Sequence, residues 1–398
     1  MKNTLSGLVQ FALDFLPGRF PVVRWRGRSR NTHQPAAVLV VGRSPFVNHL
    51  PEQFFAESPT RENIGMCSLF TLRRTMERLA PTVDLTILRI HRWVLDRFHP
   101  AARLRIPEWI ATQAVLPADL AGWLAAVGQR RADQKRMRYN RLTTSVSHAA
   151  TDFERFYHEM YVPFLRNRHG AQAVVRSWQC LRRGFDRGGL IWVHRDGETV
   201  AGLLYEQDGH TFRPLYLGTP HGDLQPVKLG ALAATYVASV HLAHETGCTR
   251  LDFSGNRPSL RDGVLRYKSK RDGVVAEKED SFFEQRVFWD DSSATTLDFL
   301  GHIAPIFVDR DGLSGLHVLA GDEPPTASTA KRLRSDLWVP GLQRLYLVSP
   351  AGWGEPHPPA PSDTVLVSGS HLATALDRAS ATAPASRRHV PRHPSETD

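Results

Sequence analysis

The side chains most able to do chemistry lie in residues 250–272, which contain seven lysines and arginines and three aspartates. Residues 250–254 predict a buried strand that opens into a loop, and open α/β sheets place ligands at such strand ends. A positive cluster in that place suits an anionic ligand such as a pyrophosphate. Most charge runs form solvated faces, and that alternative stays open. Against it, apolar residues alternate with the charges and force some of them inward (Leu260, Val264, Leu265 and Tyr267).

Strands before this segment must position it. Three are predicted, over residues 191–194, 199–205 and 211–218. Pro214 inside the third has no N–H to donate, so it predicts either an edge strand or a bulge. A bulge would part the strand from its neighbour and open a slot, where freed backbone groups could bind a cofactor arm. Residues 281–288 predict the strand that closes the unit.

A helix is predicted between Pro226, which suits a first helical position, and Gly247, which suits a position just past the end. Its entry, residues 225–231, combines a glutamine, a lysine and a glycine. Backbone N–H groups and the helix dipole could hold a phosphate there, with Lys228 adding charge. An ordinary capped core helix explains the same pattern equally well.

Three motifs carry a family resemblance. Residues 241–253 form a helix-to-strand turn that ends in an aspartate–phenylalanine pair, and residues 263–270 contain a glycine followed by Tyr267-Lys268. Residues 136–141 with 152–157 join a basic segment to an acidic helix start. In these places the chain resembles the GNAT superfamily, and within it the Fem-type peptidyltransferase-like branch that includes BioF2-like acetyltransferase domains. The resemblance covers roughly residues 36–290 and implies two GNAT-like halves in tandem.

The chain departs from the family pattern in two places. The family continues after its lysine with a phenylalanine–glycine pair, whereas residues 270–273 keep the glycine and lose the aromatic residue. In the phosphate loop, Gly230 lies five residues after Gln225 rather than three. Both departures weaken the prediction of coenzyme A as the donor more than they weaken the prediction of the fold.

The resemblance implies a direct attack of an amine or hydroxyl on an activated acyl carbonyl. Such chemistry needs a donor to the oxyanion, a base and an acid for the leaving group. Lys268 matches the family lysine near the acyl carbonyl, with phosphate binding as its alternative role. Tyr216 and Tyr267 are the candidate acids, although tyrosines of this kind are more often core aromatics. Asp252 and His244 are the candidate bases, and a lone histidine such as His244 is more often a surface residue.

Binding residues are predicted on both sides of the reaction. For a coenzyme A co-substrate they are Gln225, Lys228, Gly230, Ala231, Asn256, Arg257 and Arg266. A basic helix after residues 118–128, together with the end of a later helix, predicts the acceptor side through Arg136, Arg138, Arg168 and His169. A solvated interdomain helix is the alternative for the basic stretch. No tightly bound cofactor and no metal cluster is expected.

Composition bounds the rest of the prediction. The chain has 398 residues, a net charge of +10 and three cysteines at scattered positions, which suits two domains, an acidic partner and a reducing compartment. We expect an α/β (α+β) fold of tandem mixed sheets flanked by helices. The expected divisions are a basic arm (1–35), a first half (36–142), an acyltransferase half (143–290), a helical extension (291–348) and a disordered tail (349–398). Residues 59–79 are predicted to be mostly helical, with Met66, Leu69, Phe70 and Leu72 facing inward.

The sequence therefore predicts a GNAT-type N-acyltransferase that moves an acyl group from acyl-CoA or an acyl carrier protein to an amine. The acceptor would be a small molecule, a glycolipid or a peptide. One alternative is a Fem-like peptidyltransferase that uses aminoacyl-tRNA, and another is a non-catalytic binder of RNA or anionic lipid. We expect a cytoplasmic protein without a transmembrane segment. The amphipathic and basic residues 1–30 leave peripheral membrane contact open.

Overall fold

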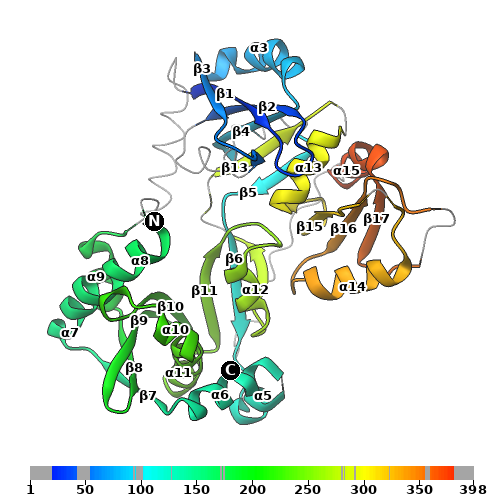
Figure 1. Ribbon diagram of the computed structural model, residues 1–398. Coiled ribbons are helices and arrows are strands. Elements are labelled where there is room, and N and C mark those ends of the chain that lie inside the picture. Colours follow the sequence, from blue (N-terminus) through cyan, green and yellow to red (C-terminus); the bar gives the residue numbers. More distant parts are fainter. Residues whose placement is uncertain are drawn as a thin grey trace, which may run out of the picture.

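The computed structural model describes residues 20–42, 54–92, 95, 102–126, 128–170, 173, 175–278, 281, 283–290, 293–321, 323–354 and 359–380. Within these ranges the chain forms three mixed sheets flanked by helices (Figure 1). The predicted α/β class of fold is confirmed. Of the helices described, none is long and apolar enough to cross a membrane. Most of the predicted amphipathic segment, residues 1–19, lies outside the described residues.

The first sheet has six strands in the order β3-β1-β2-β4-β13-β5. Their bounds are β1 Phe20–Arg28, β2 Pro35–Gly42, β3 Thr60–Cys67, β4 Leu85–His91, β5 Leu104–Pro107 and β13 Phe283–Phe288. Alternate residues of β2 face opposite sides: Leu39 and Val41 pack under helix α3 (Leu69–Leu79), and Val38 and Val40 enter the larger core on the other side.

Two expectations for this region differ from the structure. The predicted helix is confirmed only from Leu69, with Leu69 and Leu72 buried, because residues 60–67 form the edge strand β3. Met66 and Phe70 are 56% and 80% exposed rather than inward. Part of the predicted basic arm is also ordered, since β1 pairs with both β2 and β3.

The second sheet has seven strands in the order β12-β6-β11-β10-β9-β8-β7. Their bounds are β6 Ile110–Val115, β7 Leu142–Ser147, β8 Gly188–Arg195, β9 Glu198–Asp208, β10 Thr211–Gly218, β11 Arg250–Asn256 and β12 Val274–Glu277. Leu190 and Trp192 pack on one face with α7 (Ala150–Arg155), the π-helical turn η2 (Phe156–Tyr161) and α9 (Trp178–Phe185). Their neighbours Ile191 and Val193 pack on the other face, beneath α11 (Ala231–Glu245). Helix α8 (Val162–His169) follows η2.

The first two sheets exchange strands. Strand β6 belongs by sequence to the predicted first half, yet it pairs with β11 and β12 of the second sheet. Strand β13 belongs to the predicted second half, yet it pairs with β4 and β5 of the first sheet. The predicted boundary at residue 142 therefore separates neither sheet cleanly, because each half supplies a strand to the other.

The third sheet, in the order β14-β15-β16-β17, was not predicted. Its strands are β14 Ile306–Val308, β15 Leu313–Val318, β16 Arg344–Ser349 and β17 Thr364–Ser368, and its helices are α13 Ala294–Ile303, α14 Ala327–Leu337 and α15 Leu372–Ser380. The expected helical extension is thus an α/β unit. Strand β17 and helix α15 lie inside the predicted tail, where the proline-rich surroundings conceal a five-residue apolar strand that pairs with β16. Residues 381–398 lie outside the described residues.

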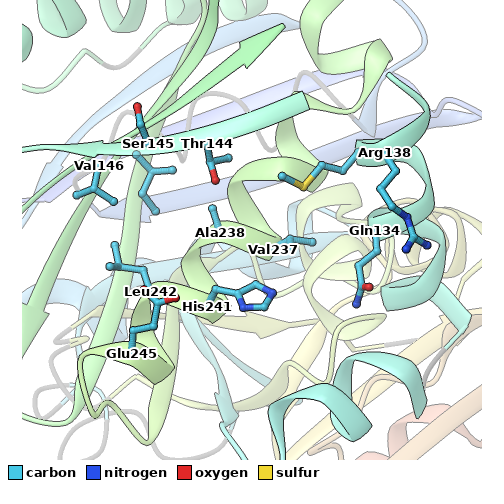
Figure 2. A pocket seen from close by; sticks show the side chains of 12 residues that line it. Gln134, Arg138, Thr144, Ser145, Val146, Val237, Ala238, His241, Leu242 and Glu245 are labelled. Atoms are coloured by element: carbon cyan, nitrogen blue, oxygen red, sulfur yellow. The ribbon is translucent and has the colours of Figure 1, made fainter. Parts of the chain in front are cut away.

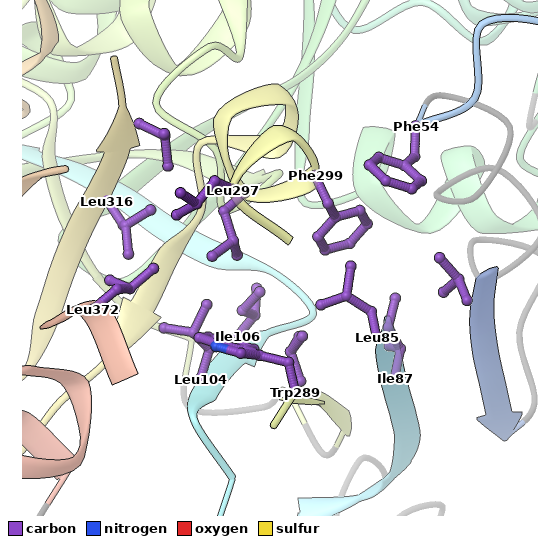
Figure 3. Close-up of a cluster of buried hydrophobic side chains, with 14 of the residues drawn as sticks. Phe54, Leu85, Ile87, Leu104, Ile106, Trp289, Leu297, Phe299, Leu316 and Leu372 are labelled. Carbon is purple, nitrogen blue, oxygen red and sulfur yellow. The ribbon is translucent and has the colours of Figure 1, made fainter. Parts of the chain in front are cut away.

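One apolar core joins the third unit to the first sheet. Leu85 and Ile87 of β4, Phe299 of α13 and Leu372 of α15 belong to one cluster of buried side chains (Figure 3). Phe299 is fully buried, and its ring lies edge-on to that of Phe54 with centroids 5.0 Å apart. The third unit therefore shares its core with the first sheet rather than forming a separate tail domain.

Several helices connect the sheets and flank the site. They are α5 (Leu120–Ala126), α6 (Gly128–Tyr139), α10 (Gln225–Leu229) and α12 (Gly263–Ser269), with short 3-10 turns at Ala80–Thr82, Pro220–Gly222 and Gly369–His371. The single helix expected after Pro226 is broken at Gly230, whose φ of 106° is left-handed, so α10 ends there and α11 begins.

Candidate functional site

Strands β10 and β11 form a fork. They pair in parallel at only two positions, Thr211 with Arg250 and Phe212 with Leu251, and then part. Beyond that point β10 has a register shift against β9 between Pro214 and Tyr216. The bulge predicted at Pro214 is confirmed, and the alternative of an edge strand is wrong, because β10 lies between β11 and β9 (Figure 1). The fork leaves backbone groups of two adjacent strands without ladder partners.

Arg213 clamps the base of the fork. Its Nε donates to Asp252 Oδ2 of β11 at 2.9 Å, and its other guanidinium nitrogen pairs with Glu206 of β9. Asp252 Oδ1 accepts the backbone N–H of Ser254 at 2.8 Å. Both oxygens of the predicted base are therefore engaged. This geometry favours a structural role for Asp252, in which it ties the two strands together just before they separate.

Strand β11 is irregular on its other edge as well. Its pairing with β6 shifts register between Asp252 and Gly255, and Ser254 has a φ of 63°, an uncommon conformation for a residue with a side chain. Asn256 is 3% exposed, and its amide donates to Thr112 Oγ1 and, at 3.2 Å, to the Ser254 carbonyl. Among the described residues its Oδ1 accepts no hydrogen bond. Asn256, predicted to bind the co-substrate, thus fixes this bend and keeps one acceptor unused.

Lys268 lies against the β11 wall of the fork. It projects from α12, whose first turn is capped by Asp262 through a 2.7 Å hydrogen bond to the Leu265 N–H. The Lys268 ammonium donates to the backbone carbonyl of Phe253. Burial lowers the pKa of Lys268 to about 8, while the carboxylates of Asp262 and Asp252 oppose this shift. A lysine of this kind is mostly charged at neutral pH and is poorly hydrated, so it can stabilise a developing oxyanion.

Tyr216 belongs to β10, and its side chain packs with the buried cluster around η2 and α9. Its ring lies edge-on to Tyr161 of η2, with centroids 5.2 Å apart. Burial raises the pKa of the Tyr216 hydroxyl, with Arg176 acting in the opposite direction. The phenol therefore keeps its proton at neutral pH, as a proton donor to a leaving group must.

Tyr267, the second predicted acid, is held elsewhere. Its hydroxyl donates to the Leu232 carbonyl in the first turn of α11 at 3.2 Å. The Arg271 guanidinium lies 3.5 Å from its ring centroid. Burial raises the pKa of Tyr267 well above its usual range. These contacts make Tyr267 a link between α12 and α11.

The predicted phosphate loop is not a free helix terminus. A side chain at Gly230 would place its Cβ 2.7 Å from Cδ of Arg136, so α6 covers the α10–α11 junction closely. Asn140, one residue past the end of α6, donates to the Leu229 carbonyl at 2.8 Å. Ala231 is fully buried in the core beneath α11, whereas Gln225 and Lys228 are exposed on α10. Gly230 was predicted to bind the acyl donor and Arg136 the acceptor substrate. The structure places the two residues together at this junction.

The remaining predicted residues lie apart from Lys268. Arg257 and Arg266 are exposed, and Arg168 on α8 is exposed with its guanidinium 5.9 Å from the Phe164 ring centroid. The side chain of His169 lies outside what the structure describes. His244 bonds the Ala118 carbonyl at the end of α11, roughly 18 Å along the helix axis from the Leu232 turn.

Arg138 lines a separate groove between α6, β7 and α11, with a volume of about 580 Å³. Figure 2 shows Arg138 and Gln134 at one end of this groove and Glu245 at the other. The acceptor residues predicted on α6 therefore divide between two places. Arg136 covers Gly230, and Arg138 faces the groove.

Two parts of the site were not predicted from the sequence. Arg213 is a single charge in an apolar strand, and its position directly before Pro214 was the one available signal. Arg271 belongs to the basic run and is nevertheless 3% exposed, paired with Asp133 of α6. Nothing local to residues 268–273 indicates that partner, which lies 138 residues earlier. Among the described residues, no group of histidine, cysteine and acidic side chains could hold a metal ion.

Comparisons with known proteins give limited likeness. No protein-family profile matches the chain, and no curated protein matches it. FemX superimposes with a TM-score of 0.34 at 11% identity, over 70% of this chain and 95% of its own. L-PGS from Bacillus licheniformis gives 0.31 at 11% identity, over 70% and 87%. A GCN5-related N-acetyltransferase from Sphaerobacter thermophilus gives 0.30 at 10% identity, over 65% and 78%.

These neighbours include proteins of the Fem and GNAT types that the three sequence motifs resemble. Scores and identities this low carry no argument about activity. What the chain can do chemically follows from the fork, from Lys268 and from the groups around them.

Proposed function

We propose that this chain is a GNAT-type N-acyltransferase, which transfers an acyl group from a thioester donor to an amine by direct attack. The observation that supports this most is the half-buried Lys268 ammonium, which donates to the Phe253 carbonyl of β11 just beyond the point where β10 and β11 stop pairing. A charged donor in a partly dry opening between strands is suited to a carbonyl oxygen that gains negative charge.

The fork suits an extended donor. After Phe212 and Leu251 the two strands no longer pair. On β11 the Phe253 carbonyl accepts from Lys268 and the Ser254 N–H donates to Asp252. A ligand arm that carries amide groups can add there as a short strand if it bonds to the β10 backbone and displaces these side-chain contacts on β11. Such an arm would deliver its terminal thioester toward Lys268 of α12 and Tyr216 of β10.

The reaction would proceed in one addition and one elimination. The amine attacks the thioester carbon, and the carbonyl electrons move to oxygen, where Lys268 donates a hydrogen bond. The carbon–sulfur bond then breaks, and the sulfur takes the proton of the Tyr216 hydroxyl, which is later replaced from solvent. The excess proton of the attacking amine passes to water, because both oxygens of Asp252 are already engaged.

An aminoacyl ester donor is the second candidate, and one observation favours it. Arg136 covers Gly230 at the junction where the diphosphate of coenzyme A would be expected. Exposed basic side chains continue along α6 and suit a longer polyanion such as RNA (Arg131, Lys135 and Arg138). The ester carbonyl would use the same fork and the same lysine.

A thiol-release assay tests the proposal. The purified chain would be supplied with acetyl-CoA and longer acyl-CoAs together with a panel of amines, and free thiol would be followed over time. Amine-dependent release is the expected result. Its absence with every pair, combined with release of the amino acid from aminoacyl-tRNA, would favour the second candidate. Inertness toward both donors would contradict the assignment as a transferase.

A further inference from the structure

A set of charged side chains is buried between the connecting helix α6 and the end of α12. Arg130 and Asp133 of α6 are 2% and 1% exposed, and Arg271 is 3% exposed. Asp272 follows Arg271 directly and is partly buried. We call these four residues the charge lock. They bind no part of the proposed substrates, and the chemistry proposed above does not use them.

Arg271 is the centre of the charge lock. Its Nε donates to Asp133 Oδ2 at 2.6 Å, and another guanidinium nitrogen donates to the Tyr267 carbonyl at 2.8 Å. The same guanidinium stacks on the Tyr267 ring at 3.5 Å, and Tyr236 of α11 donates its hydroxyl to the Arg271 carbonyl at 3.2 Å. Arg271 thereby ties α12 to two other helices.

A second pair supports the first. Arg130 pairs with Asp272 and lies 3.9 Å from the Trp123 ring centroid. Gln129 donates to the remaining oxygen of Asp133 at 3.1 Å. The Asp133 carboxylate is therefore fixed on both oxygens, and it cannot turn away from Arg271 without losing a hydrogen bond.

Stability alone is a weak reason for this arrangement. A buried ion pair loses much of its attraction to desolvation, and well-packed apolar residues of similar volume often stabilise as well or better. What an ion pair adds is direction, because each hydrogen bond holds at only one orientation of the partner. The orientation fixed here is that of the last turn of α12, which also carries Lys268.

We propose that Asp133 and Arg271 are positioning residues, which set the rotation of α12 so that Lys268 stays against the Phe253 carbonyl. The inference rests on the proposed function, because Lys268 is its reacting group. The physical link is short. Arg271 holds the carbonyl of Tyr267, and the Tyr267 hydroxyl is held by α11. Lys268 is the next residue, so any rotation of this turn carries its ammonium away from β11.

The test uses Asp133→Asn, which keeps the shape and removes the charge that holds Arg271. The readout is the titration of the Lys268 ammonium by NMR of lysine-labelled protein, with the signal assigned from Lys268→Ala. In the wild type Lys268 should titrate near pH 8, and in Asp133→Asn its pKa should move toward the ordinary 10.5 as the ammonium reaches water. Loss of a negative charge alone would move it the other way, so the direction identifies repositioning.

Two further variants complete the design. Arg131→Gln lies on the exposed side of α6 and should leave the Lys268 titration unchanged. If Asp133→Asn unfolds, Arg271→Lys, which keeps the charge and loses the two-nitrogen contact, replaces it. A folded variant that titrates like the wild type overturns the positioning role.

The titration is independent of turnover. A shift in Asp133→Asn without acyl transfer by the wild type would leave the positioning role intact and reject the proposed function. Where transfer is observed, the expected effect is a lower kcat with an unchanged KM for the donor, because the carbonyl contact is weakened and the arm still binds.

Discussion

The fork and the α10–α11 junction are the two places where a GNAT-like donor would be held, and they are built differently. At the fork, a clamped pair of strands opens toward one half-buried lysine, with Arg213, Asp252 and Phe253 in defined contacts. At the junction, Gly230 is covered by Arg136, and Gln225 and Lys228 are exposed. The carbonyl end of the site is thus preorganised, while the phosphate end is not. The proposed carbonyl chemistry therefore depends on the fork. The identity of the donor depends on the α10–α11 junction.

The largest expected effect is on catalysis at the fork. Removal of one donor to a developing oxyanion lowers rates by about 10²- to 10³-fold. We expect Lys268→Ala to reduce kcat for thiol release by about that factor. Lys270→Ala, two residues on and exposed, should change it by less than about twofold. An equal kcat for thiol release in Lys268→Ala and the wild type would show that Lys268 takes no part in acyl transfer.

The next effect is on stability against pH. Burial lowers the pKa of Lys268 to about 8 in the folded chain from an ordinary 10.5. Below pH 8 both the folded and unfolded states hold the proton, so the folded state bears the full cost of the buried charge. Between pH 8 and 10.5 the unfolded state binds more protons, and the free energy of unfolding rises with pH. The rise amounts to roughly 3 kcal/mol.

Urea unfolding across this pH range measures that rise. The wild type should gain stability relative to Lys268→Met as the pH increases, because the methionine variant has no proton to lose at this position. Parallel curves for the wild type and Lys268→Met would show that the Lys268 ammonium is hydrated. The contrast between a desolvated lysine at the fork and exposed residues at the junction would then fail.

The clamp at the base of the fork should have a smaller effect. Arg213→Ala leaves Asp252 without its ion-pair partner and Glu206 with only Arg187. We expect a loss of about 1–3 kcal/mol in the free energy of unfolding, since buried acceptors lose charged donors. Arg195→Ala is the matched control, because the ion pair of Arg195 with Asp196, at 3.7 Å, lies on the surface. A control as damaging as Arg213→Ala would deny the clamp any special role.

The smallest effect is predicted at the junction. Lys228 is exposed, and exposed charges contribute less than about 1 kcal/mol to an interaction in salt. Lys228→Ala should therefore raise the KM for any acyl-CoA by less than about fivefold. An increase of about tenfold or more would show that the junction does grip a donor phosphate, and the comparison between the two ends of the site would fail.

The predictable features of the chain were local ones. Pro214 removes a backbone donor wherever it stands, so it limited the choice to an edge strand or a bulge, and the place of β10 between β9 and β11 makes it a bulge. Residues 263–270, one of the three motifs that carry the family resemblance, contain the helix α12. The break at Gly230 was missed because glycine tolerates both helical and left-handed φ, so the residue type does not show which of the two it adopts.

The features that escaped prediction depend on distant partners. Strands β6 and β13 cross between sheets, and no local pattern records which sheet accepts a strand. Strand β17 was hidden by proline-rich surroundings, although it pairs with β16 over five positions. Arg271 and Asp133 carried the composition of a solvated surface, and their burial depends on each other. Features of the site that depend on the type of a single residue could be predicted. Features that depend on two residues far apart in the sequence could not.

The central claim is that a donor carbonyl reaches Lys268 through the fork between β10 and β11. The most direct test is a crystal structure with an acyl-CoA analogue in which a methylene group replaces the thioester sulfur. We predict that its arm lies between the two strands beyond Phe212 and Leu251, with its carbonyl oxygen bonded by Lys268 in place of the Phe253 carbonyl. An analogue bound instead in the groove beside Arg138, with the fork empty, would contradict this account.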